Sequence, residues 1–179
     1  MNKSVMIVGV GGQGTLLASR ILGDAMMDQG YDVKVSEVHG MSQRGGSVVT
    51  YVRYGDKVYS PIIETGEADI VLAFEQLEAA RFLPYLKEGG TVVTSTQKID
   101  PMAQLLPGKK EYPPGPALVK WRKKGVNLLA VDALKLAEEA GSRSGQRSAH
   151  RRHGTSAWAG KRRRGSPPWS AAFRPSSWK

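Results

Sequence analysis

A glycine-rich turn near the start of the chain limits the folds that this sequence can adopt. The turn follows an apolar, β-branched stretch at 4–10 and precedes a stretch with helical periodicity that begins at Thr15. Gly9, Gly11 and Gly14 give it the spacing G-x-G-x-x-G, in the strand–turn–helix context that this pattern needs. The N–H groups at the start of the helix would then point at the turn and favour an anion there. Two interpretations stay open: the turn contacts a phosphate or cofactor, or it only allows the helix to pack tightly on the strand.

A second glycine-rich segment, residues 39–46, follows the next expected strand. It reads HGMSQRGG and holds an imidazole, a hydroxyl, an amide and a guanidinium between glycines. Because ligands of open α/β sheets bind outside the carboxyl ends of the strands, we expect the two glycine-rich segments to lie side by side at one site. His39 is interpreted either as a catalytic group or as a hydrogen-bonded loop residue. Arg44 either clamps a carboxylate or phosphate through its planar fork, or braces the loop or a subunit contact.

Glu37, at the end of the second expected strand, leaves a different class of site open. A Rossmann domain places its ribose-binding carboxylate at this position, so a nicotinamide or flavin site is an alternative. The other interpretation of Glu37 is a carboxylate that is solvated or that pairs with Arg44.

The pattern of apolar residues predicts an α/β fold, a Rossmann-like layered domain with a mostly parallel sheet and a β-hairpin. The hairpin is expected around Gly55-Asp56, between strands at 47–54 and 57–60. Further strands are predicted at 4–10, 33–38, 70–74, 91–96 and 126–131, and helices at 15–29, 75–82 and 132–140.

The helix at 15–29 is expected to be amphipathic and to end at Gly30. Its apolar residues predict one buried side that packs on the sheet. The residues of that side are Leu16, Leu17, Ile21 and Leu22.

The formal net charge of +10 comes entirely from the end of the chain. Residues 142–179 hold ten Lys and Arg and no Asp or Glu, whereas residues 1–141 hold 16 charges of each sign. The end also lacks Val, Ile, Leu and Met, which strands and amphipathic helices need. We favour a sequence read out of frame over a basic arm for RNA or an acidic partner. We therefore expect an α/β domain at 1–141, incomplete at its C-terminal end, and a disordered or frameshifted tail at 142–179.

The amino-acid composition excludes some chemistry and indicates a compartment. The sequence has no cysteine, so this chain holds no disulfide, thiolate nucleophile or cysteine-bound iron–sulfur cluster. It shows no signal-peptide pattern and no apolar run long enough to span a bilayer. We expect a cytoplasmic location.

The chain resembles a known family in three stretches. They read GVGGQG at 9–14, SEVHGMSQRGGSVVTYVRYG at 36–55 and VYSPIIETGEADIVLAFEQLEAAR at 58–81. In this combination they are similar to the small (beta or gamma) subunits of the 2-oxoacid:ferredoxin oxidoreductases, most closely those of the branch that acts on indolepyruvate. The resemblance runs from about Lys3 to Gly141 and stops there.

This resemblance implies an oxidoreductase that acts as part of a complex. An aryl pyruvate such as indolepyruvate, coenzyme A and oxidised ferredoxin would give the aryl-acetyl-CoA, carbon dioxide and reduced ferredoxin. The carbanion formed by decarboxylation needs an electron sink, which thiamine diphosphate supplies and no side chain does. Electron transfer to ferredoxin calls for iron–sulfur clusters, which a chain without cysteine cannot hold. The resemblance therefore implies a large partner subunit that carries thiamine diphosphate and the clusters, while this chain completes the active site.

Site residues follow from the two glycine-rich segments. His39 and Arg44 are the expected catalytic residues, and no metal ligands are expected. Two functions of other classes stay open: a stand-alone NAD(P)- or flavin-binding protein, and nucleic-acid binding through the basic tail. The residues expected to contact a cofactor or coenzyme A are Gly9, Gly11, Gly12, Gln13, Gly14, Ser42, Gln43, Gly45 and Gly46.

Overall fold

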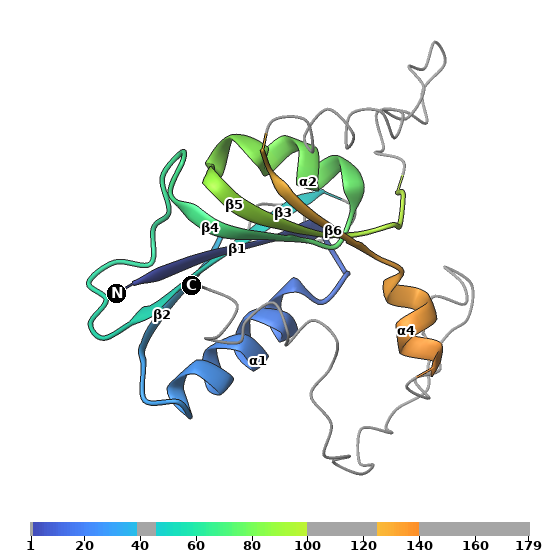
Figure 1. The fold of residues 1–179 in the computed structure, drawn as a ribbon. Helices are drawn as coiled ribbons and strands as arrows, with labels where there is room; N and C mark the ends of the chain where they lie inside the picture. The colour runs from blue at the N-terminus through green and yellow to red at the C-terminus, as the bar shows by residue number, and fades with distance from the viewer. Residues whose placement is uncertain (1, 39–45, 100–124, 140–179) are drawn as a thin grey trace. The chain divides into compact units, whose positions relative to one another are not determined.

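Six strands form one sheet with helices on both of its faces (Figure 1). The computed structural model describes residues 2–38, 46–99 and 125–139, all within the first of two compact units of the chain, residues 1–143. The tail expected at 142–179 lies outside the described residues. The elements are β1 (Lys3–Val10), α1 (Thr15–Met27), β2 (Asp32–Val38), β3 (Ser47–Gly55), β4 (Ala68–Ala73), α2 (Gln76–Phe82), the 3-10 turn η1 (Leu83–Tyr85), β5 (Leu86–Ser95), β6 (Asn127–Val131) and α4 (Ala133–Glu139).

Strand β1 lies inside the sheet because it is apolar on both of its faces. Its residues from Val5 to Val8 are fully buried, as expected for a continuous apolar run covered on both sides. It pairs in parallel with β4 and antiparallel with β3. The full strand order is β2-β3-β1-β4-β5-β6.

The directions of the strands confirm the α/β class and correct one detail. Three of the five pairings between described strands are parallel, and the two that involve β3 are antiparallel. The hairpin expected at Gly55-Asp56 is wrong, because β3 uses both of its edges to pair with β1 and β2. Residues 57–60 form no strand, and the N–H of Val58 donates to the carboxylate of Asp32 at 2.8 Å instead. The antiparallel pairs are β2–β3 and β1–β3.

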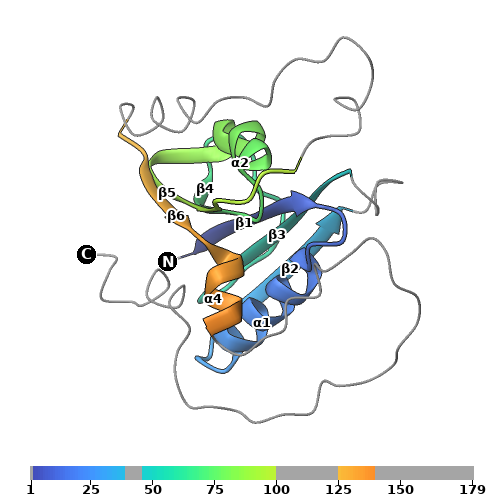
Figure 2. The same cartoon turned by 90° about the vertical axis from the view of Figure 1, so that its right-hand side faces the viewer.

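The helices divide the core into two sides (Figure 2). Met6 and Val8 of β1 face α2 and join Ala79 in one buried cluster. The alternate residues of β1 face the other side, because successive side chains of a strand point to opposite faces. Helix α1 covers that side over β2 and β3, and α4 follows β6 on the same side as α1 (Figures 1 and 2).

Helix α1 buries a different side from the one expected. Leu22 is buried, but Leu16, Leu17 and Ile21 are 37%, 52% and 42% exposed. The expected apolar side is therefore wrong in three of its four residues. Buried Gly23 faces β2, where a Cβ would lie 3.8 Å, an ordinary contact distance, from the side chains of Val33 and Val35. The residues that α1 does bury are Thr15, Ser19, Leu22, Gly23 and Met26.

The ends of two further elements can be compared with their expected positions. Strand β5 begins at Leu86, before the expected start at 91, and contains Gly89 and Gly90 rather than following them. Helix α4 begins after Asp132, whose carboxylate accepts from the N–H of Lys135 at 3.0 Å, as expected for an N-cap.

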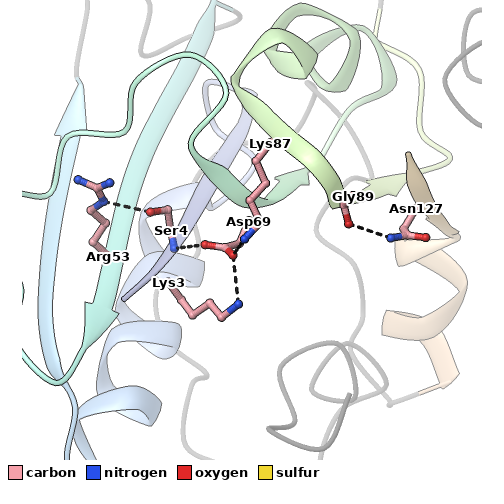
Figure 3. A network of polar contacts seen from close by, with 7 residues as sticks. All are labelled: Lys3, Ser4, Arg53, Asp69, Lys87, Gly89 and Asn127. Atoms are coloured by element: carbon pink, nitrogen blue, oxygen red, sulfur yellow. Dashed lines mark hydrogen bonds and ion pairs between the residues drawn. The ribbon is translucent and has the colours of Figure 1, made fainter. Parts of the chain in front are cut away.

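An ionic network joins the strands at the end of the sheet where β1 and β4 begin (Figure 3). Asp69, which is 5% exposed, accepts hydrogen bonds from the Ser4 N–H at 2.9 Å and from Lys3 Nζ at 3.1 Å. Lys87 of β5 donates to the same carboxylate. The network extends through Ser4 Oγ, which accepts from Arg53 Nε at 3.0 Å. The carboxylate of one residue thus connects β1, β4 and β5.

Candidate functional site

The candidate site lies at the carboxyl ends of β1 and β4. These two strands are parallel neighbours, and α1 and α2 leave them toward opposite faces of the sheet (Figure 2). In open α/β sheets such a divergence of two connections opens a crevice where ligands bind. The N–H of Phe74 donates to the carbonyl of Val8 at 2.9 Å, which holds the two strand ends together.

Glycine is favoured at three positions of the 9–14 turn for two reasons. Gly12 and Gly14 have φ angles of 96° and 84°, in the left-handed region that favours glycine. Gly9 is crowded, because a Cβ there would lie 2.9 Å from Gln13 Oε1 and 3.2 Å from the Cβ of Phe74. The strand and both following connections therefore approach each other more closely than a side chain at Gly9 would allow.

The side chain of Gln13 connects the end of β1 to the residue that follows β4. Its Oε1 accepts from the N–H of Val10 at 2.7 Å, and its Nε2 donates to the carbonyl of Phe74 at 3.2 Å. The backbone N–H of Gln13 donates to the carbonyl of Val10 at 3.1 Å. Gln13 thus stabilises the turn from within.

The two glycine-rich segments meet at Gly46. The N–H of Gly11 donates to the carbonyl of Gly46 at 2.8 Å, so the last residue of the second segment lies against the first turn, as expected. The N–H groups of Val10, Gly11 and Gln13 thus all donate to acceptors within the protein. This arrangement favours close packing over a phosphate cradle as the role of these three N–H groups.

The other expected site residues lie outside the described residues. They are His39, Ser42, Gln43, Arg44 and Gly45.

Glu37 does not have the position that a dinucleotide site needs. In a Rossmann domain the acidic strand lies next to the strand with the glycine turn. Here β3 lies between β2 and β1, which adds one strand spacing of about 4.8 Å. The carboxylate of half-buried Glu37 instead lies 3.5 Å from the hydroxyl of buried Ser19, which also lies 2.9 Å from the carbonyl of Leu16.

Two buried carboxylates at this edge were not singled out from the sequence. Glu75 caps α2, and its carboxylate accepts from the N–H groups of Leu77 at 2.7 Å and Glu78 at 3.0 Å. Glu78, which is 3% exposed, accepts from the hydroxyl of Ser47 and from Arg81 Nε at 3.1 Å. The spacing Glu-x-x-Glu directly after a buried strand is the sequence signal that indicates such a helix start.

The described residues also form a hollow along β6, but no metal-binding group of side chains and no membrane-spanning helix. A hollow of about 420 Å³ is lined by Thr91 and residues 125–129 along β6, which β4 and β5 separate from β1. No three His, Cys, Asp or Glu side chains among the described residues are grouped to hold a metal ion. No described helix has the length and apolar character needed to cross a membrane.

Comparison with known proteins assigns the chain to a family. The family model described as pyruvate ferredoxin/flavodoxin oxidoreductase matches residues 4–156. The chain belongs to this family. The match contains both glycine-rich segments and the whole of the described sheet after Lys3.

Curated relatives within the family are similar over most of the sheet. The chain is 48% identical over 141 residues to indolepyruvate oxidoreductase subunit IorB of Pyrococcus horikoshii, an alignment that covers 78% of this chain and 69% of the relative. It is 41% identical over 143 residues to the subunit of the same name from Archaeoglobus fulgidus, with 79% and 70% covered. It is 32% identical over 133 residues to the common gamma subunit of the pyruvate/ketoisovalerate oxidoreductases of Thermococcus litoralis, with 73% and 64% covered.

Solved structures of the family share the fold. The gamma subunit of a keto/oxoacid ferredoxin oxidoreductase from Geobacter sulfurreducens has a TM-score of 0.53 at 23% identity, over 79% of this chain and 68% of that one. The 2-oxoglutarate:ferredoxin oxidoreductase from Magnetococcus marinus has a TM-score of 0.57 at 19% identity, over 79% of this chain and 22% of that one. At these identities the likeness shows the α/β fold alone.

Proposed function

We propose that this chain is the small subunit of an indolepyruvate:ferredoxin oxidoreductase. The observation that carries the proposal is the 48% identity over 141 residues to an indolepyruvate oxidoreductase subunit. The reaction oxidatively decarboxylates an aryl pyruvate in the presence of coenzyme A, to give the aryl-acetyl-CoA, carbon dioxide and reduced ferredoxin. A cytoplasmic location stays part of the proposal as a prediction from the sequence.

The cofactors of the reaction belong to a large partner subunit in this proposal. Thiamine diphosphate supplies the electron sink for the decarboxylation. This chain has no cysteine and, among its described residues, no metal-binding group of side chains, so its own residues do not fit an iron–sulfur cluster. Its contribution is the edge at the carboxyl ends of β1 and β4, with the Gly9–Gly14 turn and the adjoining segment 39–46. His39 and Arg44 of that segment act on the substrate or on the cofactor that the large subunit holds.

The geometry gives a reason to prefer this function to a stand-alone dinucleotide-binding protein. Three N–H groups of the glycine turn donate within the protein, and Glu37 lies on a strand that is not adjacent to β1. Both features are at odds with a pyrophosphate on the turn and a ribose on the carboxylate. A purified chain that retains a flavin or nicotinamide would reverse this preference.

Co-purification with the large subunit tests the proposal. We expect a stable complex that reduces ferredoxin only when indolepyruvate and coenzyme A are both present, whereas this chain alone is inactive. Replacing indolepyruvate by pyruvate or 2-oxoglutarate in the same assay identifies the substrate class. A complex that does not form, or that forms without coenzyme A-dependent turnover, would contradict the proposal.

Substitutions in the second glycine-rich segment test its catalytic role. Arg44→Lys keeps the positive charge but loses the bidentate fork, and His39→Ala removes the imidazole. In the complex each is expected to slow turnover by about tenfold or more, which corresponds to roughly 1.4 kcal/mol in the barrier. Arg20→Lys on the exposed side of α1 is the matched control. Normal turnover in both His39→Ala and Arg44→Lys would assign the segment a structural role only.

A further inference from the structure

The Gly9–Gly14 turn and the start of β3 meet at the carboxyl end of β1. The sheet gives the start of β3 limited support, because the β1–β3 ladder ends at Ser47 opposite Val10 and the β2–β3 ladder ends at Val49. The chain before β3 continues the contact by one hydrogen bond, from the N–H of Gly11 to the carbonyl of Gly46 at 2.8 Å. Strand ends open more readily than strand centres. A stable position for Gly46 therefore needs a further contact.

Glu78 supplies that contact from the neighbouring helix. The hydroxyl of Ser47 donates to Oε2 of Glu78, and Arg81 Nε donates to Oε1 at 3.1 Å. The side chain of Glu78 is 4% exposed. Burying a carboxylate is costly unless it is paired and hydrogen-bonded, and here each oxygen has one donor. The two partners thus hold the carboxylate in one orientation, and the carboxylate holds Ser47.

We propose that Glu78 and Ser47 are positioning residues for the candidate site. Their hydrogen bond fixes the start of β3 on α2, and through Gly46 it fixes the Gly9–Gly14 turn. The inference rests on the proposed function, because that function places the turn at the active site of the complex. Ser47 directly follows segment 39–46 in the sequence, so the same contact sets the point at which that segment joins the sheet.

The position of the contact argues for a role beyond general stability. The network around Asp69 already joins the strands at the opposite end of the sheet. The Ser47–Glu78 contact joins α2 to β3, two elements that are not neighbours in the chain, at the edge where the turn lies. Its loss should therefore change the site edge while the centre of the sheet stays intact.

Hydrogen exchange of the Gly11 amide tests the structural half of the proposal in the full chain. Ser47→Ala removes the hydroxyl, and Glu78→Gln has one acceptor oxygen in place of two. Both are expected to speed exchange at Gly11 by about tenfold or more, with no change at the buried amides of β4. Ser47→Thr keeps a hydroxyl and should restore slow exchange. Ser60→Ala, which removes an exposed hydroxyl that accepts from the N–H of Ile62 in the connection after β3, is the control.

Turnover of the complex tests the catalytic half. Ser47→Ala and Glu78→Gln are expected to lower kcat by about tenfold with Ser47→Thr restoring it, while Ser60→Ala has no effect. Unchanged Gly11 exchange in both variants, or normal turnover despite faster exchange, would overturn the positioning role. An unsubstituted complex without turnover would instead overturn the proposed function and the catalytic half with it. The exchange of Gly11 decides the structural half in either case.

Discussion

At the scale of single residues, Gln13 connects the two strands between which the candidate site lies. Its amide is the one side chain of the glycine turn with a hydrogen bond to each strand end, to Val10 on one side and to Phe74 on the other. The sequence motif gave Gln13 a cofactor-binding role, because a motif records spacing and not the direction of a side chain. The structure adds a bracing role that spacing alone could not predict.

Replacing Gln13 by methionine tests this bracing role. Gln13→Met keeps the length of the side chain but leaves the N–H of Val10 and the carbonyl of Phe74 without their partner. An unsatisfied, partly buried polar group costs about 1–3 kcal/mol, and we expect a loss of that size in the free energy of unfolding measured with urea. Gln29→Met, at an exposed position after α1, is the control. Equal stability of the two variants would contradict the bracing role.

Asp69 gives the domain a specific sensitivity to acid. Burial alone would raise the pKa of this carboxyl, but hydrogen bonds from Lys87, the Ser4 N–H and Lys3 outweigh burial and hold the pKa below its ordinary value. The folded protein therefore releases the proton of Asp69 at a lower pH than the unfolded chain does. The stabilisation is complete above about pH 5 and is lost as the pH falls through about 4 and below.

Asp69→Asn should remove this sensitivity. The variant loses hydrogen bonds to charged groups, and we expect it to be less stable by about 2 kcal/mol at neutral pH. The difference should shrink as the pH falls from about 5 toward 3, because the unsubstituted protein then loses the same charge. Urea unfolding at a series of pH values measures this difference. A difference in stability between the two proteins that stays constant with pH would show that the charge of Asp69 is not responsible for it.

At the scale of elements, α2 depends on a capping residue of an unusual type. Glu75 is buried and accepts from two N–H groups at the helix start, a place that Ser, Thr, Asp or Asn takes more often. We expect Glu75→Ala to lower the free energy of unfolding by about 1–2 kcal/mol. Glu75→Gln keeps one acceptor oxygen, so its free energy of unfolding should fall by less than that of Glu75→Ala. Exposed Glu64→Ala is the control, and a loss as large there would rule out capping as the explanation.

The elements themselves could be predicted from the sequence more readily than their neighbours in the sheet. Apolar runs and glycine stops placed β1, α1, β4 and α4 within a few residues of their observed ends. The insertion of β3 between β1 and β2 was not predicted, because strand pairing depends on contacts distant in sequence. The buried side of α1 was wrong because apolar residues occur around much of this helix, so their pattern does not define one side; Gly23 is among the residues that α1 buries.

At the scale of the whole molecule, the sequence separates a neutral body from a basic end. All of the positive excess lies in residues 142–179. The expectation that these residues form no part of the packed domain predicts that their deletion leaves the urea midpoint of the remaining chain unchanged. The same deletion should abolish retention on RNA or another polyanion, because it removes the positive charges that attract the polyanion. A fall in the midpoint after deletion would show that these residues contribute to the fold.

Strand β6 has a consequence for the behaviour of the chain before it finds a partner. It is an outermost described strand, and none of its five residues is charged. Strand β2, at the opposite side of the sheet, carries Asp32, Lys34 and Glu37. Uncharged strand edges are the templates on which further chains add to form cross-β aggregates, whereas charges oppose that growth. Newly made protein in which the edge of β6 stays unpaired is therefore expected to aggregate from this strand.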